Sequence, residues 1–101
     1  MFNRLLDFTQ NIVQMQVDLT GGYYDAGDNV KYGLPMAFTI TTLSWGALHY
    51  EKELTVAGEI QNVRDAIKWG TDYFLKATET PNQIWAQVLI LNERVHCILI
   101  Y

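Results

Sequence analysis

The chain has 101 residues, of which 50% are apolar and 18% are charged, and its formal net charge at pH 7 is −4. A chain of this length holds one domain at most, and its composition predicts a globular protein and excludes a disordered one. The mild negative charge argues against a nucleic-acid partner. The single cysteine, Cys97, excludes an internal disulfide, and no apolar run is long enough to form a membrane segment.

The first expected element is a helix that runs roughly from residue 2 to residue 16. Leu5, Phe8, Ile12 and Met15 recur at helical spacing, which places them on one apolar stripe. The first residues lack an unbroken apolar core and a small-residue cleavage site. We therefore see no signal peptide in this chain.

A turn-rich stretch follows, from Asp18 to Gly33, in which tyrosines, glycines and closely spaced carboxylates gather. Some of its residues permit backbone angles that a residue with a Cβ resists, namely Gly21, Gly22 and Gly27. The chain can therefore fold tightly and bring Asp25 and Asp28 to one rim. Two carboxylates that share a small volume raise each other's pKa, and a water held between them is readily deprotonated. This arrangement indicates a hydrolase.

The stretch also allows two other interpretations. Asp and Gly are common turn formers, so an Asp-x-Gly-Asp sequence also occurs in loops whose acids only make local hydrogen bonds. A calcium loop that starts at Asp25 would need a glycine where Val30 stands and a bidentate Glu where Met36 stands, which excludes that interpretation. His49 has no second His or Cys at metal-ligand spacing. We therefore expect no metal ion and no cofactor.

The next expected helix starts near Pro35, a residue suited to a first helical turn. Its apolar residues form two stripes, one of Met36, Ile40, Leu43, Ala47 and Tyr50 and another of Phe38, Trp45 and Leu48. Apolar residues on two faces predict a helix that is buried on most sides. Trp45 could serve as a platform for a sugar ring, but a tryptophan in this setting is more typical of a core.

A further helix is expected from Ala57 to Ala77, with an amphipathic pattern. Its apolar stripe contains Ile60, Val63, Ile67 and Phe74, and its charged residues fall largely elsewhere. Asp72 and Lys76 are spaced for an i,i+4 ion pair. Trp69 is expected to pack against the neighbouring helix.

The rest of the chain is expected to be non-helical. A loop from Thr78 to Asn82 contains Pro81, and Ile84 to Val88 alternates like a short extended segment. The remainder, Leu89 to Tyr101, is an apolar tail and an aggregation hazard.

Two long segments of the chain carry a resemblance to a known family. They are "VDLTGGYYDAGDNVKYGLPMAFTITTLSW", from Val17 to Trp45, and "GEIQNVRDAIKWGTDYFLKATETPNQIWAQV", from Gly58 to Val88. In this order they resemble the N-terminal part of the catalytic domain of family 9 glycoside hydrolases, the endo-1,4-β-glucanases or cellulases especially common in plants. By this resemblance residues 1–88 form the N-terminal part of such a domain, and residues 89–101 form a divergent apolar tail.

The resemblance also implies an activity and site residues. Asp28 matches the family's catalytic base, which activates the attacking water, and Asp25 matches the partner that helps to hold this water in line. The implied reaction is the hydrolysis of internal β-1,4-glucosidic bonds in cellulose and related β-glucans by inversion. In an inverting enzyme a separate acid, about 6.5–9.5 Å from the base, protonates the leaving oxygen. The family's acid is a Glu near the far C-terminal end of a much longer domain, and we expect none of the glutamates in this chain to replace it.

The fold implied by the resemblance is all-α, a partial (α/α)6 barrel of the six-hairpin glycosidase type with only about the first quarter of its helices. The chain departs from the family in a shortened stretch before Val17 and in the absence, after Val88, of the Gly-Asp loop and cleft residues. These departures indicate a fragment or a truncated gene product. Family members are mostly secreted or membrane-anchored, so the resemblance implies secretion or a cell-wall location, and it implies a β-1,4-glucan as the partner. The alternative is a catalytically inactive remnant with at most weak glucan binding.

Overall fold

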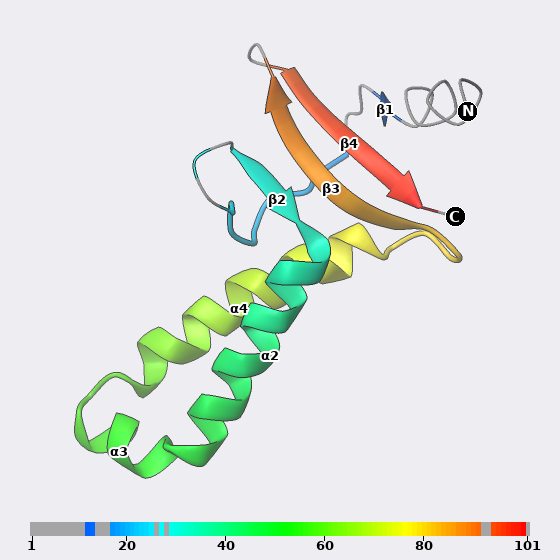
Figure 1. Ribbon diagram of the computed structural model, residues 1–101. Helices are drawn as coiled ribbons and strands as arrows, with labels where there is room; N and C mark the ends of the chain where they lie inside the picture. The colour runs from blue at the N-terminus through cyan, green and yellow to red at the C-terminus, as the bar shows by residue number, and fades with distance from the viewer. Residues whose placement is uncertain (1–11, 14–16, 26, 28, 92–93, 101) are drawn as a thin grey trace.

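The computed structural model describes residues 12–13, 17–25, 27, 29–91 and 94–100. Their elements are, in chain order, β1 (Ile12–Val13), β2 (Val30–Tyr32), α2 (Gly33–His49), α3 (Glu51–Val56), α4 (Ile60–Ala77), β3 (Ile84–Leu91) and β4 (Arg94–Ile100). The described part is mostly helical, with a small sheet. Figure 1 shows α2 and α4 running side by side, α3 at their far end and the sheet at the opposite end.

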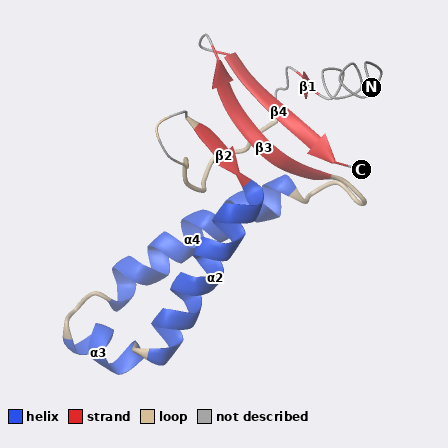
Figure 2. Cartoon of the chain, viewed as in Figure 1, coloured by secondary structure: helices blue, strands red, loops and turns tan. Residues whose placement is uncertain are grey.

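The sheet has the strand order β1-β4-β3-β2, and all of its pairs are antiparallel. The centre of the sheet is the antiparallel pair β3–β4, in which Leu91 pairs with Arg94 at one end and Ile84 pairs with Ile100 at the other. Strand β2 pairs with β3 and passes without a break into α2 (Figure 2). The sheet therefore holds the beginning of α2 and the end of the turn-rich stretch in one place.

This sheet shows that the expectation of an all-α chain is wrong. Ile12 and Val13, expected within a helix, pair instead with Ile98 and Cys97, and the rest of that expected helix lies outside the described residues. Most of the expected apolar tail forms β4. A run rich in β-branched and large apolar residues fits a pleated, half-buried surface, and its backbone groups find partners in β3. The extended segment predicted from Ile84 is confirmed and continues to Leu91.

The two helices predicted after the turn-rich stretch are confirmed with shifted boundaries. Pro35 lies in the first turn of α2, as expected. The last helix begins at Ile60 and not at Ala57, because Gly58 has a φ of +75° and separates α4 from the short α3. Within the described residues, no helix has the length and apolar character needed to cross a membrane.

The hydrophobic core lies where the helices meet the sheet. Its buried members are Leu19, Met36, Ile40, Tyr73, Ala77, Trp85, Val88, Cys97 and Leu99. The apolar stripe predicted for α4 is only partly right, because Ile67 and Phe74 are half-buried against this core while the buried positions are Gly70, Tyr73 and Ala77.

The burial predicted for α2 is wrong in the described chain. Only Met36 and Ile40 of this helix are buried, and the second stripe is exposed, including Trp45, which was expected in the core. Helix α4 and the sheet cover one side of α2, so the second apolar stripe has no cover from the described residues.

Candidate active site

The turn-rich stretch contains the predicted acids, and we call its residues 18–29 the aspartate loop. Gly21 and Gly22 have φ values of +99° and +68°, so the predicted glycine turn is confirmed. A Cβ on Gly21 would lie 2.9 Å from the carbonyl oxygen of Trp69, and one on Gly22 would lie 2.7 Å from the sulfur of Met36. At Gly27 an added Cβ would meet nothing within 4 Å. The close approach of the loop to α4 and α2 therefore requires glycine at the first two positions only.

Three hydrogen bonds attach this part of the loop to α4. The amide of Gly22 donates to the carbonyl of Trp69 at 2.9 Å, and the indole Nε1 of Trp69 donates to the carbonyl of Gly22 at 2.9 Å. The hydroxyl of Tyr23 donates to the carbonyl of Ala66 at 2.8 Å. Trp69 is thus an anchor of the aspartate loop, a role that its helical periodicity did not suggest.

A buried lysine attaches the loop to β2. Lys31 is only 6% exposed, and its Nζ donates to the carbonyl oxygens of Leu19 at 3.0 Å and of Gly21 at 2.7 Å. The same ammonium lies 5.1 Å from the ring centroid of Tyr24 and 5.3 Å from that of Tyr73, within the range of a cation–π contact. Burial, assisted by the positive charge of Lys76, lowers the pKa of Lys31. Because β2 is paired with β3, these bonds connect the loop to the sheet.

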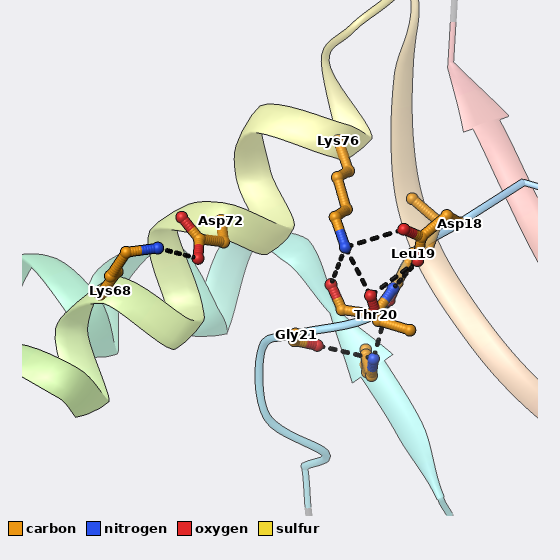
Figure 3. A network of polar contacts seen from close by, with 8 residues as sticks. Asp18, Leu19, Thr20, Gly21, Lys68, Asp72 and Lys76 are labelled. Carbon is orange, nitrogen blue, oxygen red and sulfur yellow. Dashed lines mark hydrogen bonds and ion pairs between the residues drawn. The ribbon is translucent and has the colours of Figure 1, made fainter.

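Lys76 of α4 binds the beginning of the loop (Figure 3). Its Nζ lies 3.0 Å from Oδ2 of Asp18 and donates to both the carbonyl and the hydroxyl oxygen of Thr20. Oδ1 of Asp18 accepts from the Thr20 hydroxyl at 2.6 Å and from the Thr20 amide at 3.0 Å. The hydrogen bonds from Thr20 and Lys76 hold the pKa of Asp18 well below its usual range. Asp18 is therefore a fixed structural anion.

This network shows that the predicted Asp72–Lys76 ion pair is wrong. Asp72 pairs instead with Lys68, one helical turn earlier, with Nζ and Oδ2 2.5 Å apart. Lys76 points to the loop, where a carboxylate, a carbonyl and a hydroxyl group are all within its reach.

The structure places one of the two predicted site acids. Asp25 is exposed, and its amide donates to the carbonyl of Val30 at 2.8 Å in an isolated antiparallel bridge. Asn29 closes this bend with a φ of +55°. Asp28 lies outside the described residues, so its position relative to Asp25 stays a prediction.

Asp25 lines a small hollow of about 170 Å³. The other lining residues are Tyr23, Tyr24, Tyr32, Pro35, Met36 and Thr39. Among the described residues, Asp25 forms no ion pair with a lysine or arginine, in contrast to Asp18. The hollow is smaller than the roughly 300–1,000 Å³ of typical ligand pockets. It can provide an acid and aromatic faces for part of a ligand.

The sequence pattern identifies the aspartate loop but not the residues that hold it in place. Lys31, Lys76 and Trp69 contact the loop from β2 and α4. One local signal was present for Lys31, since a lysine between Val30 and Tyr32 interrupts an apolar run next to a glycine-rich turn. In the described part of the chain, no three His, Cys, Asp or Glu side chains come together in a group that could hold a metal ion.

Comparison with known proteins identifies the family. The model of the family described as Glycosyl hydrolase family 9 matches residues 6–93. The chain is 66% identical over 74 residues to Endoglucanase 16 of Arabidopsis thaliana, a match that covers 73% of this chain and 15% of that protein. It is 68% identical over 72 residues to Endoglucanase 8 of Oryza sativa subsp. japonica, with 71% and 14% covered.

Solved structures agree with the sequence matches. The endoglucanase of the termite Nasutitermes takasagoensis superposes with a TM-score of 0.69 at 49% identity, covering 77% of this chain and 18% of that chain. The cellulase Cel9M of C. cellulolyticum in complex with cellobiose superposes with a TM-score of 0.68 at 38% identity, covering 73% and 17%. The chain thus spans about 15% of the length of the curated relatives that it matches. Since the family model covers most of the sequence, the chain belongs to glycosyl hydrolase family 9.

Proposed function

We propose that this chain is the N-terminal part of an endo-1,4-β-glucanase catalytic domain, which hydrolyses internal β-1,4-glucosidic bonds in cellulose and related β-glucans. The match to family 9 over residues 6–93 supports the proposal, as do relatives named endoglucanases. In this proposal residues 1–88 belong to the domain, α2 and α4 are early helices of an (α/α)6 barrel, and residues 89–101 are a divergent tail. Secretion or a cell-wall location is part of the same proposal.

The observation that carries the proposed site is the setting of Asp25. Asp25 is exposed and lines the same small hollow as Tyr23 and Tyr24, on a loop that Lys31 and Trp69 hold from two sides. A catalytic carboxylate needs a backbone that does not move and a free face toward the substrate. Tyrosine rings offer flat apolar faces on which a pyranose ring can stack.

In the proposed mechanism Asp28 and Asp25 act together on one water molecule. The oxygen of the water attacks the anomeric carbon while Asp28 accepts one of the water's protons. Asp25 accepts a hydrogen bond from the other O–H of the same water and so orients the attack. Inversion requires a separate acid on the opposite face of the sugar, far enough away to leave room for the water. The two aspartates share the water side, so neither of them is that acid.

A second proposal concerns the 101-residue chain by itself. We propose that it is catalytically inactive and at most binds glucan weakly. It spans about 15% of the length of a curated relative, and the resemblance assigns the acid Glu to a distant part of the domain. Glu51 and Glu53 lie on α3, at the end of the helices that is remote from the sheet (Figure 1).

A chimera tests the proposed site. The 74-residue matched segment of Arabidopsis Endoglucanase 16 is replaced by the corresponding segment of this chain, and reducing ends released from a soluble β-1,4-glucan are measured. Asp28→Asn is expected to lower kcat by about 10²–10⁴, because the base is lost while the side-chain volume is kept. Asp25→Asn is expected to lower kcat less.

The matched control is Asp65→Asn, since this exposed residue of α4 accepts a hydrogen bond from Gln61 of the same helix and lies outside the aspartate loop. It should leave kcat unchanged. Full turnover by Asp28→Asn in an active chimera would refute the assignment of the base. In a parallel assay of the 101-residue chain, measurable release of reducing ends would refute the proposal of an inactive remnant.

A further inference from the structure

One peptide group of the aspartate loop, the group that joins Gly21 to Gly22, is held at both of its polar ends. Its carbonyl oxygen accepts a hydrogen bond from Nζ of Lys31 at 2.7 Å. Its N–H donates to the carbonyl of Trp69 at 2.9 Å. Lys31 belongs to β2 and Trp69 to α4, so two separate elements fix the plane of this peptide group.

The local sequence does not fix this peptide group by itself. Both residues that flank it are glycines, with φ values of +99° and +68°. Because glycine populates positive and negative φ about equally well, a peptide group between two glycines can turn over at little steric cost. The orientation of the group therefore depends on its two hydrogen-bond partners.

Lys31 acts on the main chain of the loop. Its side chain is buried, and within the described part of the chain it forms no ion pair with a carboxylate. Its ammonium donates instead to the carbonyl oxygens of Leu19 and Gly21. A buried charge is costly unless hydrogen bonds compensate for it, and here the compensating acceptors are main-chain oxygens. These bonds therefore fix the course of the backbone ahead of the predicted site.

The backbone of Asp25 lies between contacts that come from Val30 and Lys31. On its N-terminal side, the held peptide group ends at Gly22, three residues earlier, and the ring of Tyr24 lies 5.1 Å from Nζ of Lys31. The amide of Asp25 itself donates to the carbonyl of Val30, the residue before Lys31, at 2.8 Å. A shift of Lys31 relative to the loop would therefore be transmitted to Asp25.

We propose that Lys31 is a positioning residue of the active site, which fixes the Gly21–Gly22 peptide group and through it the place of Asp25. This inference rests on the proposed function, in which Asp25 orients the attacking water. Lys31 acts only through the loop and is assigned no contact with the sugar or the water. A misplacement of roughly 1 Å at a catalytic group can lower the rate about 10²-fold, so a backbone contact of this kind can matter for turnover.

A double-mutant cycle in the chimera described above tests the proposal. Lys31→Met is expected to lower kcat roughly 10–100-fold, measured well below the melting temperature of the variant. KM should change by less than about twofold, because Lys31 does not bind the glucan. Since Lys31 acts through Asp25, the combined loss in the Lys31→Met and Asp25→Asn double variant should be much smaller than the product of the two single losses. A loss equal to that product would overturn the proposal.

The matched control is Ile40→Val, since Ile40 is a buried core residue of α2. This substitution weakens the core without removing a hydrogen bond and should leave kcat unchanged at the same temperature. An equal loss of kcat in Ile40→Val and Lys31→Met would reduce the role of Lys31 to stability and overturn the proposal.

The chimera also separates this inference from the proposed function. If Asp25→Asn lowers kcat while Lys31→Met retains it, the role of Lys31 is wrong and the role of Asp25 stands. If Asp25→Asn retains full kcat, the role of Asp25 in the proposed function is wrong, and the positioning role of Lys31 is wrong with it.

Nuclear magnetic resonance of the 101-residue chain tests the held peptide group without any assay of activity. With ¹⁵N-labelled glycine, the amide resonances of the seven glycines can be compared between wild type and Lys31→Met. The resonances of Gly21 and Gly22 should move or broaden, while those of Gly46 and Gly58 should not. Lys31→Gln, which keeps a neutral donor, takes the place of Lys31→Met if circular dichroism shows that the latter has lost its helices. Unmoved Gly21 and Gly22 resonances in the folded variant would contradict the inference.

Discussion

Replacing Lys31 by methionine tests whether one buried ammonium holds the aspartate loop. Methionine keeps the length and much of the volume of the lysine stem, so the packing between Tyr24 and Tyr73 changes little. The substitution removes the donor of the bonds to the carbonyls of Leu19 and Gly21, at 3.0 and 2.7 Å. Both of these residues are buried, so water does not readily take the place of the ammonium.

The size of the effect follows from two opposing contributions. A hydrogen bond to a charged group contributes about 1.5–3 kcal/mol, and a buried carbonyl left without a donor costs about 1–3 kcal/mol. Removal of the ammonium also relieves the cost of its burial, which is the main cause of its lowered pKa and returns several kcal/mol. We expect the loss of the two hydrogen bonds from Lys31 to cost more than the removal of the buried ammonium returns. Lys31→Met should therefore lower the free energy of unfolding by about 2 kcal/mol.

Two measurements check this prediction. Urea unfolding followed by circular dichroism compares Lys31→Met with Lys52→Met, a control at an exposed lysine of α3. Amide hydrogen exchange reports the loop directly, because the Gly22 and Asp25 amides are bonded to Trp69 and Val30 and should exchange faster in the variant. The reasoning is refuted if Lys31→Met matches Lys52→Met within about 0.5 kcal/mol and both amides exchange as in the wild type.

Two further predictions concern the core between α2 and α4. The Tyr73 hydroxyl is buried and has no hydrogen-bond partner among the described residues, so Tyr73→Phe should raise the free energy of unfolding by about 1 kcal/mol at pH 7. Burial raises the pKa of Tyr73 from 10.0 to about 12, so the stability that depends on a neutral tyrosine is complete below pH 10 and is lost as pH rises toward 12. Urea unfolding should therefore show a larger advantage of the phenylalanine variant at pH 11 than at pH 9. An equal difference at the two pH values would contradict this prediction. Gly70→Ala should destabilise the chain by about 1–3 kcal/mol, because its Cβ would lie 2.3 Å from Cδ1 of Ile40. The control is Gly46→Ala, whose added Cβ would meet no atom within 4 Å, and it should stabilise the chain by about 0.5–1 kcal/mol. Equal melting temperatures for the Gly70→Ala and Gly46→Ala variants would argue against close packing of α2 and α4 at Gly70.

The two long helices and the glycine turn were predictable because their causes are local. Helical spacing of apolar residues, Pro35 in a first turn and the tolerance of Gly21-Gly22 for positive φ all act within a few residues. The same local patterns pointed to the correct extended segment from Ile84. They also identified Asp25, which the structure places on the wall of a hollow.

Other features depend on partners that are distant in sequence. Strand β1 pairs with β4, which lies more than eighty residues later in the sequence. The helical spacing that includes Ile12 therefore did not indicate a strand there. Lys76 has an equally well-spaced acid on its own helix, yet it binds Asp18, because the folded loop offers several acceptors in one place.

The sequence by itself determined the two long helices, where the chain turns on glycine and which family it belongs to, because these depend on neighbouring residues and on long stretches of matching residues. The tertiary structure alone decided that Lys31 is buried, that Trp69 and Lys76 anchor the aspartate loop, and that the described residues leave the second apolar stripe of α2 exposed. Burial and ion pairing depend on which surfaces meet in space. An apolar pattern shows that a face can be covered, and only the packed fold shows whether another element covers it.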